Sequence, residues 1–432
     1  MQNASLLRDG YVVDVPYPTF VHRQAMPLWL TTITTLQGVV SPDLEKPYRY
    51  LELGCAMGIH LHLTAAANPK GHFVGVDFNA QHLLVAKEGL ETTGINNLEF
   101  IQASFTELVE KEIEPFDFIV THGVWSWIAE EHQEAILKIV DRLLKPNGIF
   151  YCNYMSHPGA TGLTSIQKLM YEMSRNLRGN SASKAIQGLN LARTVGQHKI
   201  GLFEKIPTLN QQLLELAEDK PNYVAHDFLS AHWQPQHSAD MIRKFGKIGL
   251  AYTASAGVVD NIPALTLPPE IQKIIKTLPL VTLQETVKDI ARNTLQRQDI
   301  YIRDQKKQTF DHQQYVYETL NFGLLPNAPI GKDLRQDDKL GNIKDVIGIF
   351  ERIIKLLAQR EATISTIHNL LKLNISLVQL SEIVLVLVWA GYIHPLNMSP
   401  ESKYESSTND WMLKQQLPWR CIARQGTAVE KS

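Results

Sequence analysis

The sequence of 432 residues contains only three cysteines, Cys55, Cys152 and Cys421. Three cysteines that lie far apart cannot form a disulfide framework, and their spacing matches no common set of metal ligands. We therefore expect a protein of a reducing compartment, the cytoplasm, and we expect no metal site.

Long apolar runs and an N-terminal targeting pattern are also lacking. The longest apolar run, Ile383–Ile393, is too short to cross the hydrocarbon core of a bilayer, which is about 30 Å thick. The first ten residues do not show the charged and then apolar layout of a signal peptide. We expect no membrane insertion, and we interpret the apolar run as buried core or as a dimer contact.

Charge of one sign is not in excess either. The chain has 42 Lys plus Arg against 44 Asp plus Glu, a formal net charge of -2. This balance argues against the broadly basic surface that nucleic acid or an anionic membrane would require, so we expect no nucleic-acid partner. The length is sufficient for two or three domains of about 100–200 residues each.

What the sequence does contain is a regular alternation of short apolar runs with helical patterns from residue 48 to residue 154. This alternation predicts an α/β fold with a doubly wound, Rossmann-like parallel sheet. The predicted strands are Tyr48–Leu53, Phe73–Asp77, Leu98–Gln102, Phe116–Thr121 and Ile149–Tyr154.

The remaining segments add further units to this core. Two later strand candidates, Leu250–Ala254 and Asp299–Arg303, are expected to return to the same sheet. We divide the chain into an N-terminal arm or lid (1–45), a Rossmann-like core (46–157), a helical insertion (158–235), a region that returns strands to the core (236–310) and a C-terminal domain (335–425).

The C-terminal domain has the pattern of a winged helix. Helical patterns at Val346–Gln359 and Leu377–Ala390 are followed by a short extended segment. The second helix would read DNA in such a domain, yet residues 376–395 contain no Lys or Arg to displace phosphate counterions. We therefore expect a winged-helix-like domain without a DNA-binding role.

The strongest local signal is the turn Gly54-Cys55-Ala56-Met57-Gly58 between the first strand and a helix. Glycine at such a turn permits a tight backbone and the close approach of a ligand. Asp77 ends the next strand about 20 residues later, the separation at which a carboxylate reaches a ribose hydroxyl pair. The pattern predicts a nucleotide-like cofactor that contains ribose.

The acidic Glu52 two residues before Gly54 distinguishes between cofactors. A carboxylate there would oppose the pyrophosphate of NAD, whereas it suits the amino group of S-adenosylmethionine (AdoMet), which has no phosphate. The segment resembles the E/D-x-G-x-G-x-G motif of class I AdoMet-dependent methyltransferases. Phe116–Val120 and Leu144–Gly148 are similar to the fourth strand of that family and to the turn before its fifth strand.

The resemblance implies cofactor-binding positions in this sequence. Gly54, Ala56 and Gly58 would pass beneath the methionine part of AdoMet, Asp77 followed by Phe78 would bind the ribose, and Ser104 and Phe105 would frame the adenine. Two positions depart from the family pattern. Ala56 replaces the usual Gly, which is a small change if its φ is negative, and Ser104 replaces a frequent Asp, which leaves a weaker neutral hydrogen bond.

A narrower resemblance covers nearly the whole chain. It concerns methyltransferases that carry the methyltransferase regulatory domain, whose best understood members are bacterial outer-membrane-protein lysine methyltransferases. It implies AdoMet as cofactor, a protein lysine substrate and Tyr17 and Gln24 closing over the cofactor; it also favours a homodimer. The matching segments are Tyr11 with Pro16-Tyr17-Pro18, Thr121–Ile128, Cys152–Ser156 with Pro158-Gly159 (Asn and Tyr out of order), and Tyr223–Leu229.

The chemistry of amine methylation points to further residues. A lysine amine with a pKa of about 10.4 must lose its proton before it can attack, by burial or by giving the proton to a base. Aromatic side chains exclude water and hold an ammonium group by cation–π contact. Trp125 and Trp127 follow the fourth strand and Tyr154 ends the fifth, and His122, Tyr154 or His226 could act as the acid–base group.

Two other functions remain open from the sequence. One is a small-molecule N- or O-methyltransferase, in which the insertion and the C-terminal domain form a lid around a closed pocket. The other is a catalytically silent AdoMet-binding scaffold, for which the departures at Ala56 and Ser104 are the motive.

Overall fold

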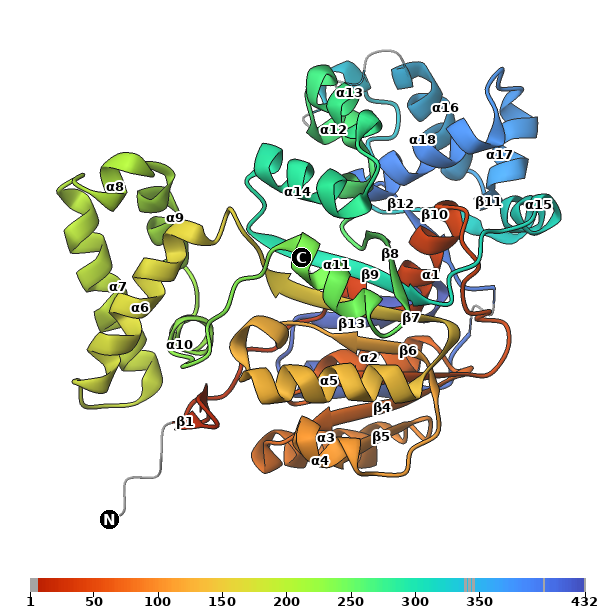
Figure 1. Cartoon of the computed structure of the whole chain (residues 1–432). Helices are drawn as coiled ribbons and strands as arrows, with labels where there is room; N and C mark the ends of the chain where they lie inside the picture. Colours follow the sequence, from red (N-terminus) through yellow and green to blue (C-terminus); the bar gives the residue numbers. More distant parts are fainter. Residues whose placement is uncertain (1–6, 338–339, 341–342, 344–345, 399–400, 431–432) are drawn as a thin grey trace.

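The computed structural model describes residues 7–430 except 338–339, 341–342, 344–345 and 399–400. A seven-stranded sheet lies at its centre, with the strand order β5-β4-β3-β6-β7-β9-β8 (Figure 1). Neighbouring strands from β5 to β7 are parallel, whereas β9 is antiparallel to β7 and to β8. The strands are β3 (Tyr48–Leu53), β4 (Gly71–Asp77), β5 (Leu98–Gln102), β6 (Phe116–Thr121), β7 (Leu144–Met155), β8 (Leu250–Ser255) and β9 (Gln296–Arg303).

The predicted α/β doubly wound core is confirmed. Both later strand candidates lie in the same sheet, as β8 and β9. The start of β7 differs from the sequence expectation, because Leu144 already pairs with Phe116 before a register shift between Phe116 and Phe118. Leu144–Gly148, which was expected to form a turn, is therefore the irregular beginning of β7.

Helices cover both faces of the sheet. On one face, α4 (Phe105–Val109), α5 (Glu130–Leu143) and α11 (Ser238–Gly246) pack on side chains such as Leu51 and Ile119. On the other face, alternate side chains of the same strands meet three helices, as the period of two in a strand requires. These helices are α1 (Pro27–Leu36), α2 (Ile59–Ala67) and α3 (Ala80–Thr93).

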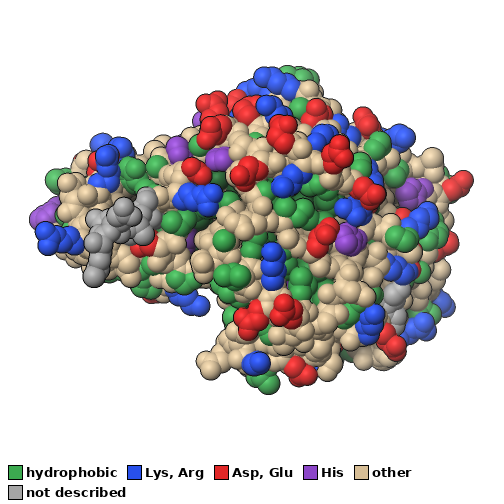
Figure 2. Space-filling view, turned by 90° about the horizontal axis from the view of Figure 1, so that it is seen from below, with side chains coloured by type: hydrophobic (Ala, Val, Ile, Leu, Met, Phe, Trp, Pro, Cys, Tyr) green, Lys and Arg blue, Asp and Glu red, His purple; other side chains and the backbone are tan. Residues whose placement is uncertain are grey.

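The insertion forms a helical lobe to one side of the sheet (Figure 1). Its apolar core also includes Val12 and Val15 of the arm and Trp127 of the sheet domain, so the lobe is packed onto both. Figure 2 shows acidic and basic side chains interspersed on the face seen from below, with an indentation between the lobe and the sheet domain. The lobe comprises α6 (Thr161–Arg175), α7 (Ser181–Gln197), α8 (Leu202–Lys205), α9 (Thr208–Leu216) and α10 (Pro221–Phe228).

The C-terminal part packs against the face of the sheet that carries α1. Its small antiparallel sheet has the order β11-β10-β12. Both predicted helices and the extended segment after them are present, but a short strand and a further helix lie between the two helices; the winged-helix assignment stays a prediction. The elements are α15 (Phe310–Thr319), β10 (Asn321–Leu324), α16 (Ile347–Leu357), β11 (Ala362–Thr363), α17 (Ile364–Leu371), α18 (Leu377–Ala390), β12 (Ile393–Leu396), α19 (Glu405–Lys414), β13 (Trp419–Ile422) and β14 (Thr427–Glu430).

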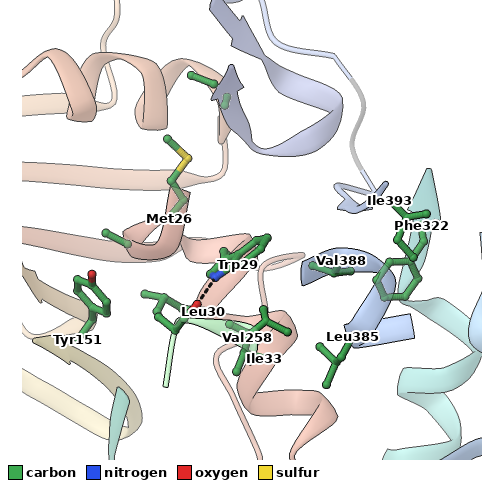
Figure 3. Packing of buried hydrophobic residues seen from close by; sticks show 14 of the residues in the cluster. Met26, Trp29, Leu30, Ile33, Tyr151, Val258, Phe322, Leu385, Val388 and Ile393 are labelled. Carbon is green, nitrogen blue, oxygen red and sulfur yellow. Dashed lines mark hydrogen bonds between the residues drawn. The ribbon is translucent and has the colours of Figure 1, made fainter. Parts of the chain in front are cut away.

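One hydrophobic cluster joins this part to the sheet domain. The Trp29 indole N–H donates a hydrogen bond to the Ala256 carbonyl at 2.9 Å. The apolar run at 383–393 belongs to this cluster, which confirms the interpretation as core. Among the described residues, no helix is long and apolar enough to cross a membrane. Figure 3 shows Trp29, Leu30 and Ile33 of α1 between Tyr151 and the C-terminal residues Leu385, Val388 and Ile393.

A buried ion cluster attaches α14 (Val281–Arg292) to the edge of the sheet. The Arg297 guanidinium on β9 contacts Glu285 at 2.8 Å and Asp289 at 2.6 Å, both on α14, and Asp299 of its own strand at 2.9 Å. All four side chains are buried. The short helices α12 (Pro263–Thr266) and α13 (Pro269–Thr277) precede α14.

We expect Arg297→Leu to destabilise the fold by about 3–5 kcal/mol, because it leaves three buried carboxylates without their shared cation. Urea unfolding at pH 7 measures the loss. Arg243→Leu is the matched control: its pair with Asp240 is exposed, so it should cost no more than about 1 kcal/mol. An Arg297→Leu protein as stable as the control would contradict the assignment.

Candidate active site

A cavity opens at the carboxyl ends of the parallel strands, where doubly wound sheets bind ligands. It holds about 890 Å³ of space that is partly open to solvent. The arm covers one side of it. Its lining includes Arg8, Asp9, Tyr11 and Tyr17 of the arm, and Gly54, Ala56, Asp77, Phe78, Asn79, His82, Ala103, Ser104, Phe105, His122, Gly123, Val124, Trp127, Ile128 and His132 of the sheet domain.

The Asp77 carboxylate holds the glycine-rich turn in place. One oxygen accepts the Ala56 N–H at 2.9 Å and the other accepts the Asn79 N–H at 2.8 Å. Each carboxylate oxygen has a second lone pair, so Asp77 can still accept ribose hydroxyls. The ribose role of Asp77 therefore remains a proposal, and its structural role is to join the turn after β3 to the start of α3.

The turn holds Ala56 in a left-handed backbone conformation. Ala56 has a φ of 46°, so the condition under which its replacement of the usual Gly would be a small change is not met. The two hydrogen bonds of Asp77 and the tight turn impose this conformation on a residue with a Cβ. Gly54 has a φ of 83°, and a Cβ there would lie 2.5 Å from Val124 Cγ2.

Gly58 ends the same turn, and its cofactor-binding role stays a prediction. Gly58 does not line this cavity, nor either of the two neighbouring cavities, one lined by Glu52 and the other by Gln24. A Cβ on Gly58 would lie 2.5 Å from the Phe100 ring, so its function is close packing of α2 against the sheet.

We expect Ala56→Gly to stabilise the protein by up to about 1 kcal/mol. Glycine removes a strain of about 1–2 kcal/mol that alanine has in the left-handed region. Because glycine also gives the unfolded chain more conformational freedom, the net gain in stability is smaller by about 0.4–1 kcal/mol. Urea unfolding tests this. The opposite change at Gly54 is the control, and Gly54→Ala should destabilise because its Cβ meets Val124. Destabilisation by Ala56→Gly would contradict the argument.

Glu52 is a buried acid next to the turn. Its Oε2 atom has no hydrogen-bond partner among the residues that the structure describes. Burial, and secondarily the Asp77 charge, raise its pKa from 4.5 to about 8. Glu52 lines a small cavity shared with Gly54, Met57, His60 and His122. An ammonium group placed there would satisfy the orphaned oxygen, so the site fits the amino group of AdoMet.

We expect AdoMet binding at pH 7 to release close to one proton, because the ligand ammonium favours ionised Glu52. Titration calorimetry in buffers of different ionisation enthalpy measures this. Glu52→Gln should abolish the release and weaken binding about 10-fold or more, the size of a charged hydrogen bond of about 1.5–3 kcal/mol. Glu91→Gln, at an exposed position on α3, is the control. Proton release that persists in Glu52→Gln would contradict the assignment.

The same raised pKa affects the ligand-free stability. The folded protein binds more protons than the unfolded chain between pH 4.5 and about 8, so this contribution to stability falls as the pH rises through that range. Glu52→Gln should remove this part of the pH dependence, which thermal unfolding at several pH values can check.

Three histidines meet beside the cofactor cavity. The arm residue His22 stacks on His122 with 3.5 Å between ring centroids, and the His22 N–H lies 3.3 Å from His60 Nδ1. His122 Nδ1 and the Tyr151 hydroxyl are hydrogen-bonded at 2.8 Å. Burial lowers the pKa of all three, to about 4 for His22 and about 3 for His60. These rings are neutral at pH 7, and the lowered pKa of His122 makes it a weaker proton acceptor than an ordinary histidine.

The opposite end of the cavity carries the residues expected at the adenine. Ser104 begins α4 and forms a capping box with Glu107. Its hydroxyl donates to the Glu107 carboxylate at 3.0 Å, so a contact with adenine would involve a hydroxyl that already makes a hydrogen bond. Phe105 and Phe78 line the cavity, and the Arg8 guanidinium lies 5.2 Å from the Phe78 ring centroid.

A second cavity of about 1010 Å³ adjoins the first. Both cavities are lined by Tyr11, Tyr17, His122, Gly123 and Trp127. Gln24 lines the second cavity and not the first, and its role in closing over the cofactor stays a prediction. The second cavity is further lined by Phe20, His22, Asn153, Asp219, Tyr223, His226, Asp227, Gln296 and Gln298.

Trp125 and Tyr154 do not reach either cavity, which corrects two of the predicted catalytic positions. Trp125 is fully buried and packs on Phe245 with 5.2 Å between centroids. The Tyr154 hydroxyl donates to Asp299 at 2.6 Å on the other side of β7. Side chains alternate along a strand, so Tyr151 and Asn153 face the site where Tyr154 cannot.

Several lining residues were missed by the sequence reasoning. Asn153 accepts the Gly123 N–H at 3.1 Å and donates to the Arg297 carbonyl at 3.0 Å. Gln296 and Gln298 alternate with buried Arg297 on β9 and reach the cavity because β9 pairs with β7. Gln296 and Gln298 could have been identified only by knowing that β9 pairs with β7, and the periodicity of the sequence does not reveal which strands pair.

Known protein families match this chain over the segments that form the site. A model described as "Methyltransferase domain" matches residues 44–235, and one described as "Predicted methyltransferase regulatory domain" matches residues 220–303. The chain is an AdoMet-dependent methyltransferase with a methyltransferase regulatory domain. In this methyltransferase AdoMet supplies an electrophilic methyl group; Glu52, Asp77 and the turn between them line the cavities at the strand ends and would hold the cofactor there.

Relatives of the methyltransferase include an uncharacterized protein of Synechocystis, 28% identical over 93% of this chain and 79% of that protein. An uncharacterized protein of Rickettsia prowazekii is 26% identical over 73% of this chain and 57% of its own length. The solved structure of PKMT2 from Rickettsia typhi has a TM-score of 0.71 at 20% identity and covers 96% of this chain and 86% of that one. The structure of PKMT2 from Rickettsia typhi in complex with AdoHcy has a TM-score of 0.68 at 22% identity and covers 89% of this chain and 78% of that one.

Proposed function

We propose that this methyltransferase transfers methyl groups to the side-chain nitrogen of lysine in proteins. One observation carries the proposal. The second cavity is lined by five aromatic side chains and two carboxylates, and among the described residues its lining includes no lysine or arginine. Such a lining favours a cation with an apolar stem, by cation–π contact and by charge.

The position of this cavity supports methyl transfer to its occupant. Trp127 and Tyr17 line both cavities, so a side chain in the second cavity lies next to the methionine end of the first. In-line displacement requires this alignment and the exclusion of water. The fold shared with the Rickettsia typhi protein titled PKMT2 is in keeping with the proposal.

Incubation with methyl-labelled AdoMet and fractionated lysate tests the acceptor class. We expect label in protein and, after hydrolysis, in N-methylated lysine. Label in small metabolites would instead support a small-molecule methyltransferase, and AdoMet binding without transfer would support a silent scaffold.

We expect Tyr223→Ala to raise KM for the protein acceptor about 2- to 30-fold, the loss of one cation–π contact of about 0.5–2 kcal/mol. Tyr223 lines only the second cavity, so AdoMet affinity should stay unchanged. Tyr315→Ala on α15 is the matched control, because Tyr315 is exposed and lines neither cavity. An unchanged KM in Tyr223→Ala would contradict the role of the second cavity.

A further inference from the structure

Asp227 lies in the second cavity next to Trp127. It is near the end of α10, and its backbone carbonyl accepts the Trp127 indole N–H at 3.0 Å. Trp127 lines both cavities, whereas Asp227 lines only the second. The hydrogen bond therefore fixes Asp227 beside the ring that separates the cofactor from the second cavity.

The groups that face Asp227 are acidic or neutral. They are Tyr11 and Tyr17 of the arm, Asp219 before α10, and Tyr223 and His226 of α10. Burial and then the Asp219 charge raise the pKa of Asp227 to about 7. A carboxylate with such a pKa can take up and release protons near neutral pH.

The other titratable groups of the second cavity are poorer proton acceptors. His226 donates its Nε2–H to the Val15 carbonyl at 2.9 Å, and burial lowers its pKa to about 4. His22 and His122 are neutral, stacked rings whose pKa values burial also lowers. Burial raises the pKa of Tyr17, so it stays protonated.

We infer that Asp227 is the base that receives the proton of the substrate ammonium before methyl transfer. The inference rests on the proposed function. The ammonium gives one proton to the Asp227 carboxylate and becomes a neutral amine. The amine nitrogen then forms the N–C bond while the C–S bond of the sulfonium breaks and its electron pair remains on sulfur. Asp227, now a carboxylic acid, returns its proton to solvent at the cavity mouth, where Asp219 is exposed.

The test is the pH dependence of kcat/KM for the full-length protein with the labelled protein acceptor. In the wild type, kcat/KM should rise with pH and level off above about pH 7. In Asp227→Asn it should fall about 100-fold or more at pH 7, within the usual range for loss of a general base, and should keep rising towards pH 10 as free amine forms without help. Asp227→Glu should restore the bend near neutral pH.

Asp219→Asn separates proton transfer from charge attraction. It removes a negative charge of the same cavity, so KM should rise, while the bend should persist and move to lower pH because Asp219 raises the pKa of Asp227. Asp311→Asn, at an exposed position on α15, is the unrelated control. AdoMet binding by Asp227→Asn should match the wild type, which shows that the variant is folded.

An Asp227→Asn profile that keeps the bend near pH 7 would overturn the inference, as would a loss confined to KM. A wild-type protein that labels no protein lysine would contradict the proposed function instead. The two failures are therefore distinguishable.

Discussion

Asp77 accepts two backbone hydrogen bonds, from Ala56 N–H in the turn after β3 and from Asn79 N–H at the start of α3. Since β3 and β4 are parallel neighbours, this single carboxylate ties together the two strand ends that form the cofactor cavity. One of these bonds goes to Ala56, which has a left-handed conformation. Glu52, whose Oε2 atom has no hydrogen-bond partner among the described residues, lies just before this turn at the end of β3.

The second cavity depends on contacts between distant parts of the chain. Trp127 joins the sheet domain to the helical lobe through its hydrogen bond to Asp227, and His226 joins the lobe to the arm through Val15. The regulatory region adds Gln296 and Gln298 from β9, which the Arg297 cluster fastens to α14. The second cavity is therefore assembled from arm, core, lobe and regulatory region together.

Much of the cofactor site could be read from local sequence. Gly54, Asp77, Phe78 and Phe105 line the cavity as expected, because strand ends of a parallel sheet meet at one edge. The predictions for Trp125 and Tyr154 are wrong because proximity to a strand end does not say which face a side chain takes. Gln24 was expected at the cofactor and lies in the second cavity, since the path of the arm depends on its packing against the lobe.

The sequence by itself determined the alternating strand–helix core, the cofactor turn with its two acids and the helical character of the insertion, because each depends on neighbours within a few residues. Tertiary structure alone decided the positive φ of Ala56, the burial of Trp125 and Tyr154 and the meeting of Asp227 with Tyr17 and Trp127. These features arise from pairing and packing between segments such as Trp127 and Asp227, which lie 100 residues apart. Local periodicity carries no information about such contacts.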